Sequence, residues 1–355
     1  MRQLARVRTL TGCSAVRRAG GGRGVRAPLG VLLIAALLLA GCGGGSANLP
    51  KGAEGRTRVS IVLDWYPWAN HSGLFLAQSR GYFKQEALEV DIHPPGNPED
   101  ILKVVAAGTD QFGISYQPDV LSARAAGVPV KSIAALVQHP LNTVMTPRGS
   151  GITRPKDLEG KKVGTPGLPS NEAMLRTMLQ TDGGSIERVE LVNVGFDLVP
   201  ALLGRKVDAI IGAYAVHEGV VAELQGQPVD IMRVQDWGVP DYYELVLVTN
   251  DNMVKQQPEV VRKFVRAASR GYADAIADGG AALEALATAH KETDRRVEGP
   301  AIARLAPLWT DGVPQFGTQT AERWQRYADW MRSRGLLDKP VKMEDCFTTE
   351  FLPKS

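Results

Sequence analysis

The stretch TPRGSGITRPKDLEGKKVGT, residues 146–165, divides this 355-residue sequence into two parts. Its first half is rich in Gly, Pro, Ser and Thr, residues that end regular structure. Its second half leads into KKVGT, residues 161–165, a run typical of a new strand. Short β-rich runs alternate with helical patterns on both sides of the stretch, which predicts an α/β protein with one sheet on each side.

The segments before residue 146 predict a first lobe. We expect its strands at 58–63, 88–93, 112–115 and 130–138, and its helices at 71–79, 98–108 and 117–126. The segments after residue 147 repeat the alternation and predict a second lobe. Its strands are expected at 161–165, 189–194 and 207–212, and its helices at 171–180 and 198–203.

The chain is then expected to return to the first lobe. A β run at 242–249 precedes an almost wholly helical segment from residue 258, and helices alone cannot build a third sheet. We therefore predict lobe 1 from residues 58–146 plus 250–355, and lobe 2 from residues 147–249. Two crossings, near Thr146 and Thr249, would form a hinge beside an interlobe cleft that closes around a ligand.

An apolar run at residues 31–40 leads into the sequence LAGC at residues 39–42. The residues before the run include seven arginines and no acidic residue. The run is shorter than the about 20 residues that a membrane-spanning helix needs. The pattern predicts a lipoprotein signal peptide, residues 1–41, and a lipid such as palmitate on Cys42. Residues 42–57 begin with CGGGS and are expected to form a flexible tether. We therefore expect an exported protein, anchored by lipid to the extracytoplasmic side of the cell membrane.

Removal of residues 1–41 would change the net charge. The whole chain has 41 Lys+Arg and 38 Asp+Glu, and without the seven leader arginines 34 basic residues face 38 acidic ones, a net charge of −4. The apparent basic character belongs to the leader, so nothing favours a nucleic-acid partner. Of the three cysteines, Cys13 would be removed and Cys42 acylated, which leaves Cys346 without a partner for a disulfide. We expect no cofactor and no metal site.

Four loops place aromatic and polar side chains at predicted strand ends, where open α/β sheets bind ligands. The densest is DWYPWANHSG, residues 64–73, whose aromatic faces suit a flat solute. The candidate ligand residues of the first lobe share this position after a strand: Asp64, Trp65, Trp68, Asn70, His71 and, after another strand, Tyr116. The alternative for Trp65 and Trp68 is ordinary packing, and that for His71 is a helix-start residue bonded to the backbone.

The second lobe and the return crossing supply the other candidates. Ser170 and Asn171 are expected to cap a helix and to receive a carbonyl, carboxylate or phosphate at its N-terminus. Tyr214 and Glu218 are four residues apart and share a face if the segment is helical. A carboxylate beside an aromatic face suits an aminopyrimidine, which it binds through a ring nitrogen and the neighbouring amine. Strand alternation lets either Tyr243 or Glu244, but not both, face the site.

Several long blocks of the sequence resemble the thiamine-precursor binding family. They are LDWYP (63–67) with NH (70–71), GYFK (81–84), SYQP (115–118), QHPLNT (138–143), residues 164–171, VGFDLVPAL (194–202) and GVPDYYE (238–244). The resemblance extends over about residues 59–352 and implies a type II periplasmic-binding-protein fold. It also implies a monomeric lipoprotein of an ABC importer that delivers formylaminopyrimidine or hydroxymethylpyrimidine to a permease and its ATPase. Trp68 and Ala69 depart from the family, which usually has small or polar residues there, and this predicts a different pocket edge.

Two alternatives use the same fold. A receptor for riboflavin, a sulfonate or nitrate is the first, but an anion receptor should place Arg or Lys in the cleft loops, which have none. A pyrimidine-phosphate synthase is the second, and its resemblance would imply a cysteine cluster near residues 236–246 and a lysine and a histidine on the first lobe. The chain has no cysteine at 236–246 and neither Lys nor His at 115–119. These absences favour a binding protein over an enzyme.

Overall fold

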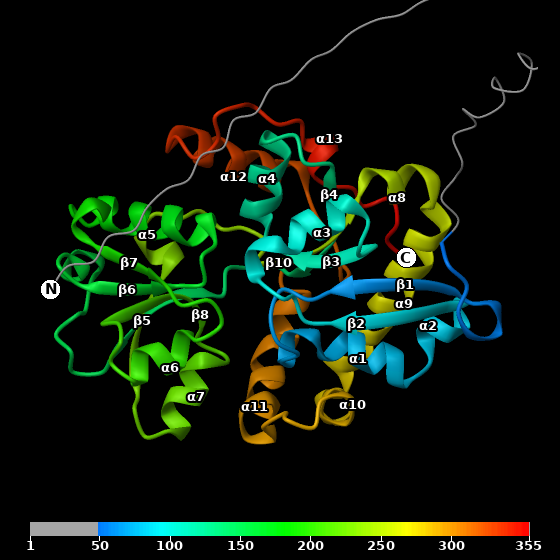
Figure 1. Cartoon of the computed structure of the whole chain (residues 1–355), viewed down its shortest axis with the longest axis horizontal. Helices are drawn as coiled ribbons and strands as arrows, with labels where there is room; N and C mark the ends of the chain where they lie inside the picture. The colour runs from blue at the N-terminus through cyan, green and yellow to red at the C-terminus, as the bar shows by residue number, and fades with distance from the viewer. Residues whose placement is uncertain (1–48, 355) are drawn as a thin grey trace, which may run out of the picture. The chain divides into compact units, whose positions relative to one another are not determined.

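The computed structural model describes residues 49–354 and contains two five-stranded sheets, one in each lobe (Figure 1). The predictions for the signal peptide, for Cys42 and for the first residues of the tether lie outside the described residues. The α/β class and the two-lobed arrangement predicted from the sequence are confirmed. In Figure 1 the second lobe, in green, lies on the left, and the first lobe is on the right.

Sheet A belongs to lobe 1 and has the strand order β2-β1-β3-β10-β4. Its strands run parallel except β10, which is antiparallel to both of its neighbours. The strand bounds are β1 Thr57–Val62, β2 Leu88–His93, β3 Phe112–Ser115, β4 Val130–Val137 and β10 Leu245–Asn250. All five were predicted from the sequence within about three residues of these bounds.

Sheet B belongs to lobe 2 and has the strand order β7-β6-β8-β5-β9. The odd strand is β5, which pairs antiparallel with both β8 and β9. The strand bounds are β5 Asn142–Pro147, β6 Lys162–Thr165, β7 Glu190–Asn193, β8 Ala209–Tyr214 and β9 Val229–Arg233. Strands β5 and β9 were not predicted from the sequence.

Each crossing therefore delivers one antiparallel strand into the sheet of the other lobe. The chain leaves sheet A at the end of β4 and enters sheet B with β5, so it crosses at residues 138–141 rather than near Thr146. It returns between the 3₁₀ turn η6 (Val234–Trp237) and β10, rather than near Thr249. Sheet membership thus places β5 in lobe 2 and β10 in lobe 1, whereas the expected bounds placed them the other way round.

The helices cover the sheets from both sides. Those of lobe 2 are α5 Pro169–Thr181, α6 Leu198–Leu203 and α7 Glu218–Leu224. Those of lobe 1 are α1 Ser72–Ser79, α2 Tyr82–Gln85, α3 Ile101–Ala107, α4 Gln117–Ala125, α8 Asp251–Gln256, α9 Pro258–Ala277, α10 Gly279–Ala289, α11 Arg295–Leu305, α12 Ala321–Ser333 and α13 Met343–Cys346. Short 3₁₀ turns are η1 Ala53–Gly55, η2 Ala69–His71, η3 Pro98–Asp100, η4 Pro155–Leu158, η5 Ile186–Arg188 and η7 Ala306–Trp309.

The C-terminal helices pack on lobe 1, as the sequence predicts. Helix α9 lies against α1 and α2, while α12 and α13 lie against α4. The contact between α9 and α1 needs glycine, because a Cβ on Gly271 would lie 2.1 Å from the carbonyl oxygen of Gly73. Helix α11 also contacts α7 of lobe 2.

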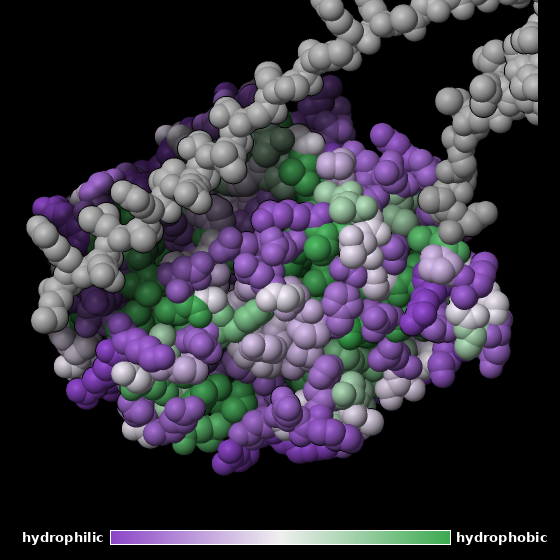
Figure 2. Space-filling model, viewed as in Figure 1, coloured by the Kyte–Doolittle hydropathy of each residue, from purple (hydrophilic) through white to green (hydrophobic). Residues whose placement is uncertain are grey.

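The hydrophobic core continues from one lobe to the other. One cluster of buried residues covers a face of sheet A under α1 and α9. A second covers the opposite face and extends into lobe 2 through residues such as Tyr242 and Tyr243 of the return crossing, which are 0% and 1% exposed. The surface in Figure 2 is mostly hydrophilic, with an apolar patch over α6 and α7, where Leu224 is exposed. Within residues 49–354, no helix has the length and apolar character to cross a membrane.

Candidate functional site

Four strand ends meet between the two lobes. The segments after β1 and β3 of lobe 1 face those after β6 and β8 of lobe 2, and all four are carboxyl ends of strands, where open α/β sheets place ligands. The inner cavity between them is lined by residues of both lobes: Asp64, Trp65, Trp68, Asn70, Tyr116, Asn142, Pro166, Leu168, Asn171, Gly212, Tyr214 and Glu218. Its volume is about 20 Å³, which is roughly the room that one water needs.

Asp64 is the buried anion on the lobe 1 side of the inner cavity. Its Oδ1 accepts a hydrogen bond from His71 Nε2 at 2.7 Å, and its Oδ2 accepts one from the hydroxyl of Tyr116 at 3.1 Å. Asn70 Nδ2 donates to Oδ1 at 3.5 Å. His71 Nδ1 accepts from the backbone N–H of Trp68 at 3.2 Å, so the proton of the neutral ring is on Nε2. His71 is fully buried behind Asp64 and orients it without lining the cavity.

The two tryptophans of the first loop both contact lobe 2. Trp65 is 7% exposed and packs into the hydrophobic core of lobe 2, edge-on to Phe196 with 4.5 Å between ring centroids. Its indole nitrogen is buried and has no hydrogen-bond partner among the described residues. Trp68 stacks on His217 with 3.5 Å between the ring centroids and 20° between the planes. The loop therefore reaches across the cleft.

Asn171 and Gly212 form part of the lobe 2 wall. Gly212 has φ 99° and lies where the pairing of β5 with β8 shifts register. A Cβ on Gly212 would lie 2.4 Å from Asn171 Nδ2, so only glycine lets the amide approach the strand this closely. The backbone N–H of Gly212 donates to Asn142 Oδ1 at 3.2 Å, which ties this bulge to the incoming strand β5.

The predicted capping role of Ser170 and Asn171 is wrong. Helix α5 has Leu168 as its N-cap and Pro169 as its first residue, because proline lacks an N–H and its fixed φ suits that position. Ser170 does not line the inner cavity. Its side chain instead forms a hydrogen bond with Asp119 of lobe 1. Burial raises the pKa of the Asp119 carboxyl to about 6, and the hydrogen bond from Ser170 lowers this pKa in part.

Tyr214 and Glu218 line the inner cavity together, but not as one helical face. Tyr214 ends β8 and Glu218 begins α7, so the residues between them form a turn. The carboxylate of Glu218 reaches back to accept the backbone N–H of Tyr214 at 2.8 Å on Oε2. Glu218 is only 4% exposed, and its other oxygen, Oε1, lies 3.6 Å from His217 Nδ1.

Glu244 joins the two crossings. Its carboxylate accepts the backbone N–H groups of Leu141 at 2.7 Å and Asn142 at 3.1 Å, and the hydroxyls of Tyr242 at 2.8 Å and Tyr214 at 3.1 Å. Burial raises the pKa of Glu244 to about 7 against the opposing effect of these four bonds. Glu244 thus contacts Tyr214, which lines the cavity, but does not line the cavity itself.

Tyr243 faces the opposite side of the return crossing. Its hydroxyl accepts the backbone N–H of Thr320 at 2.9 Å, and the guanidinium of Arg323 lies 4.3 Å from its ring centroid. It is 1% exposed and does not line the inner cavity. Tyr243 and Glu244 both precede β10, which begins at Leu245, and neither lines the inner cavity, although Glu244 contacts Tyr214 of its wall.

His217 connects the lobes, a role that the sequence analysis missed. Its Nε2 lies 3.0 Å from Glu298 Oε1 on α11 of lobe 1, and its Nδ1 lies 3.6 Å from Glu218 Oε1. Burial lowers the pKa of His217, but the two carboxylates outweigh burial and raise it to about 9. The imidazolium therefore forms an interlobe ion pair under the face of Trp68. The local sequence carries no signal for it, because Glu298 is 81 residues away.

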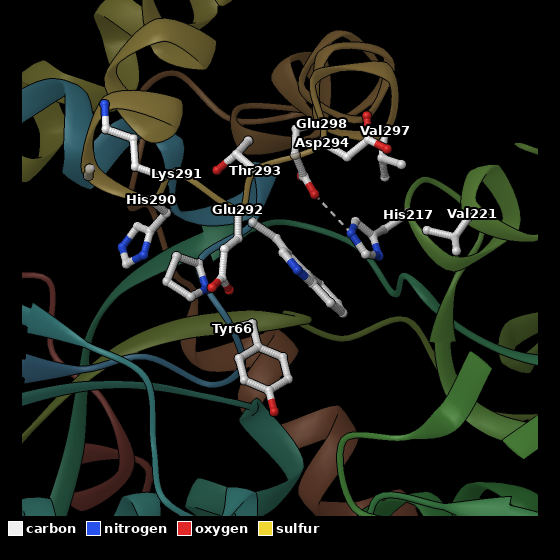
Figure 3. Close-up of a pocket in the computed structure, with 13 residues that line it drawn as sticks. Tyr66, His217, Val221, His290, Lys291, Glu292, Thr293, Asp294, Val297 and Glu298 are labelled. Carbon is white, nitrogen blue, oxygen red and sulfur yellow. Dashed lines mark hydrogen bonds and ion pairs between the residues drawn. The ribbon is translucent and has the colours of Figure 1, made fainter. Parts of the chain in front are cut away.

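A second, outer cavity is also lined by Trp68, and Figure 3 shows its lining residues. Its volume is about 770 Å³, and its walls come from the loop before η2, from α7 and from the α10–α11 connection. In Figure 3 Glu292 lies between His290 and His217, and the dashed line joins His217 to Glu298. Tyr66, which is 46% exposed, lines the same cavity.

The arrangement of lobes, crossings and cleft is the periplasmic-binding-protein fold. The alkanesulfonate-binding protein of Xanthomonas axonopodis pv. citri has this fold and matches 84% of this chain and 99% of its own with a TM-score of 0.65. The two sequences are 16% identical, so the likeness concerns the fold alone. The type II binding-protein architecture predicted from the sequence is thereby confirmed.

The chain belongs to the NMT1/THI5-like family, whose model matches residues 68–282. It is 38% identical over 322 residues to the formylaminopyrimidine-binding protein of Halalkalibacterium halodurans, a match that covers 90% of this chain and 97% of that protein. It is also 30% identical over 231 residues to a 4-amino-5-hydroxymethyl-2-methylpyrimidine phosphate synthase of Saccharomyces cerevisiae, covering 62% of this chain and 68% of the synthase. The family resemblance stated from the sequence is confirmed.

The ion pair of His217 predicts a pH-dependent stability. The pKa of His217 is raised in the folded protein, so its contribution is complete below about pH 6.5 and is lost as the pH rises through about 9. In the native protein we expect the free energy of unfolding to fall by about 3 kcal/mol between about pH 6.5 and pH 10. The variant His217→Gln should not show this fall. Urea unfolding at a series of pH values measures this loss.

His290→Gln is the matched control, because His290 lines the outer cavity but has a pKa lowered by burial. This variant should keep the loss of stability seen in the native protein. Equal pH profiles for the native protein and His217→Gln would contradict the ion pair.

Proposed function

We propose that the protein is the solute-binding component of an ABC importer, that it captures an aminopyrimidine of the formylaminopyrimidine or hydroxymethylpyrimidine type, and that it delivers the solute to a membrane permease. Membership of the family and the 38% identity to a formylaminopyrimidine-binding protein support this proposal. The two-lobed fold supports it further, because closure of two lobes around a solute is a common way to bind and release it.

The charge of the inner cavity is the observation that carries the proposal. Among the described residues, its twelve lining residues include two carboxylates, Asp64 from lobe 1 and Glu218 from lobe 2, but no lysine, arginine or histidine. Such a wall offers hydrogen-bond acceptors and no cationic side chain for a sulfonate or a nitrate, although His217 lies behind Glu218, and it favours a solute with N–H donors. An amine and a protonated ring nitrogen provide two adjacent donors.

The proposed pose follows from the groups that line the cleft. Glu218 receives the amine side of the pyrimidine in a bidentate pair, and the amide N–H of Asn70, beside Asp64, donates to the acceptor nitrogen of the opposite edge. Trp65 and Tyr214 provide ring faces, and the buried indole N–H of Trp65 is a donor for an acceptor on the solute. Asn171 then faces the exocyclic substituent. Because the inner cavity is only about 20 Å³, the lobes must separate for the ring to enter.

A synthase function is not supported by the cysteine chemistry of the described residues. Their single cysteine, Cys346, is buried near the C-terminus, and burial raises the pKa of its thiol to about 12. A thiol of this kind is unreactive at neutral pH. It is also absent from the residues that line the inner cavity.

The proposal includes export and lipid anchoring. The LAGC sequence at residues 39–42 supports cleavage before Cys42 and acylation of this cysteine, which would hold the receptor beside its permease on the extracytoplasmic side of the membrane. The Gly-rich residues that follow would serve as a tether that lets the binding lobes reach the permease.

Glu218→Gln tests the binding site directly. Glutamine keeps the size of the side chain and an acceptor for the Tyr214 N–H, but it removes the charge that pairs with the amine and the ring nitrogen. We expect the Kd for 4-amino-5-hydroxymethyl-2-methylpyrimidine to rise about 10- to 100-fold. Isothermal titration calorimetry measures it. Glu223→Gln, an exposed change on the same helix, should leave the Kd as it is, and an undiminished affinity of Glu218→Gln would remove the central assignment.

Cys42→Ser tests the anchor. In a bacterial host grown with labelled palmitate, the native chain should incorporate label and sediment with membranes, whereas Cys42→Ser should do neither, because serine offers no thiol for acylation. Cys346→Ser is the control and should behave as the native chain does. Labelled, membrane-bound Cys42→Ser protein would show that another group carries the lipid.

A further inference from the structure

The inner and outer cavities share one residue of their walls. Trp68 lines both, and the other residues that line each of them are different. One cavity has a volume of about 20 Å³ and the other about 770 Å³. The indole of Trp68 is therefore the partition between a narrow site and a wide one, within the part of the chain that the structure describes.

The partition is held in place by both its ring and its backbone. The ring stacks on His217, which is itself paired with Glu298 at 3.0 Å. The backbone N–H of Trp68 donates to His71 Nδ1, and the N–H of the next residue, Ala69, donates to Glu298 Oε2 at 2.7 Å. Glu298 thus fixes the stacking partner and the main chain together, which leaves the indole little freedom to move aside while the lobes are closed.

The outer cavity combines an aromatic face with charges of both signs, since Lys291 and His217 line it beside its carboxylates. Tyr66 offers an exposed aromatic face, and three carboxylates, Glu292, Asp294 and Glu298, line the same space. Glu298 is occupied by His217, and Asp294 is paired with Arg296. Glu292 is exposed and carries its charge into the space between His290 and His217 in Figure 3. A cationic ring near Tyr66 would be attracted by this carboxylate and by the aromatic face.

We infer that Trp68 determines the size of the solute. When the lobes close again around a solute, it limits the inner site to a pyrimidine with one ring and a short substituent, and its removal joins the two cavities so that a pyrimidine linked to a second, cationic ring fits. This inference rests on the proposed function, because it takes the inner cavity as the pyrimidine site. It adds a specificity-determining residue and the class of solute that this residue excludes.

The experiment compares two probes by calorimetry on the full chain in detergent. The one-ring probe is 4-amino-5-hydroxymethyl-2-methylpyrimidine, and the two-ring probe is thiamine, whose pyrimidine is joined through one carbon to a positively charged thiazole ring. Trp68→Ala should bind thiamine at least about tenfold more tightly than the native protein does, because removal of the indole opens the outer cavity. Tyr66→Ala enlarges the outer cavity but keeps the partition, and should show no gain.

The outcomes are distinguishable. No gain of thiamine affinity in Trp68→Ala overturns the inference, and so does an equal gain in Tyr66→Ala. Trp68→Phe, with a smaller ring on His217, should give an intermediate gain and decides the question if the alanine variant does not fold. Failure of the native protein to bind the one-ring probe would instead contradict the proposed function, while a gain of thiamine binding in Trp68→Ala would still support the partition.

Discussion

A buried carboxylate, that of Glu244, accepts hydrogen bonds from both segments that connect the lobes. Its partners are two backbone N–H groups of the outgoing crossing, Leu141 and Asn142, and the hydroxyls of Tyr242 and Tyr214. Removing the acceptor would leave these buried donors unpaired, which costs about 1–3 kcal/mol for each group. Because β5 and β10 begin at these crossings and insert into opposite sheets, the position of every loop in the cleft depends on this junction.

The opposite edge of the cleft is closed by a second polar contact. His217 pairs with Glu298 across the lobes and supports Trp68, while Glu218, beside it, faces the inner cavity. The cleft thus has a covalent connection at the crossings and a polar contact between the lobes at its other edge. A solute that touches both lobes favours the closed arrangement by its difference in affinity for the two states. The placement of Asp64 on one lobe and Glu218 on the other gives an aminopyrimidine that difference.

The fold and much of the inner cavity were predictable from local patterns, but contacts distant in sequence were not. Asp64, Tyr116 and Tyr214 follow strands, and strand ends are visible in the sequence. Strand β5 was missed because its sheet is decided by pairing with β8 and β9, which lie far along the chain. His217 was not among the candidate residues, since its partner lies on the other lobe. Ser170 was predicted to be the N-cap of α5, but the helix begins one residue earlier, at Pro169.

The central claim is that the cleft selects an uncharged or cationic aminopyrimidine over an anion of similar size. Calorimetric titration of the full chain with formylaminopyrimidine and with taurine, a small sulfonate, under identical conditions tests it most directly. The two carboxylates of the inner cavity, with no lysine, arginine or histidine among its lining residues, predict binding of formylaminopyrimidine and no measurable heat with taurine. Binding of taurine alone would contradict the account.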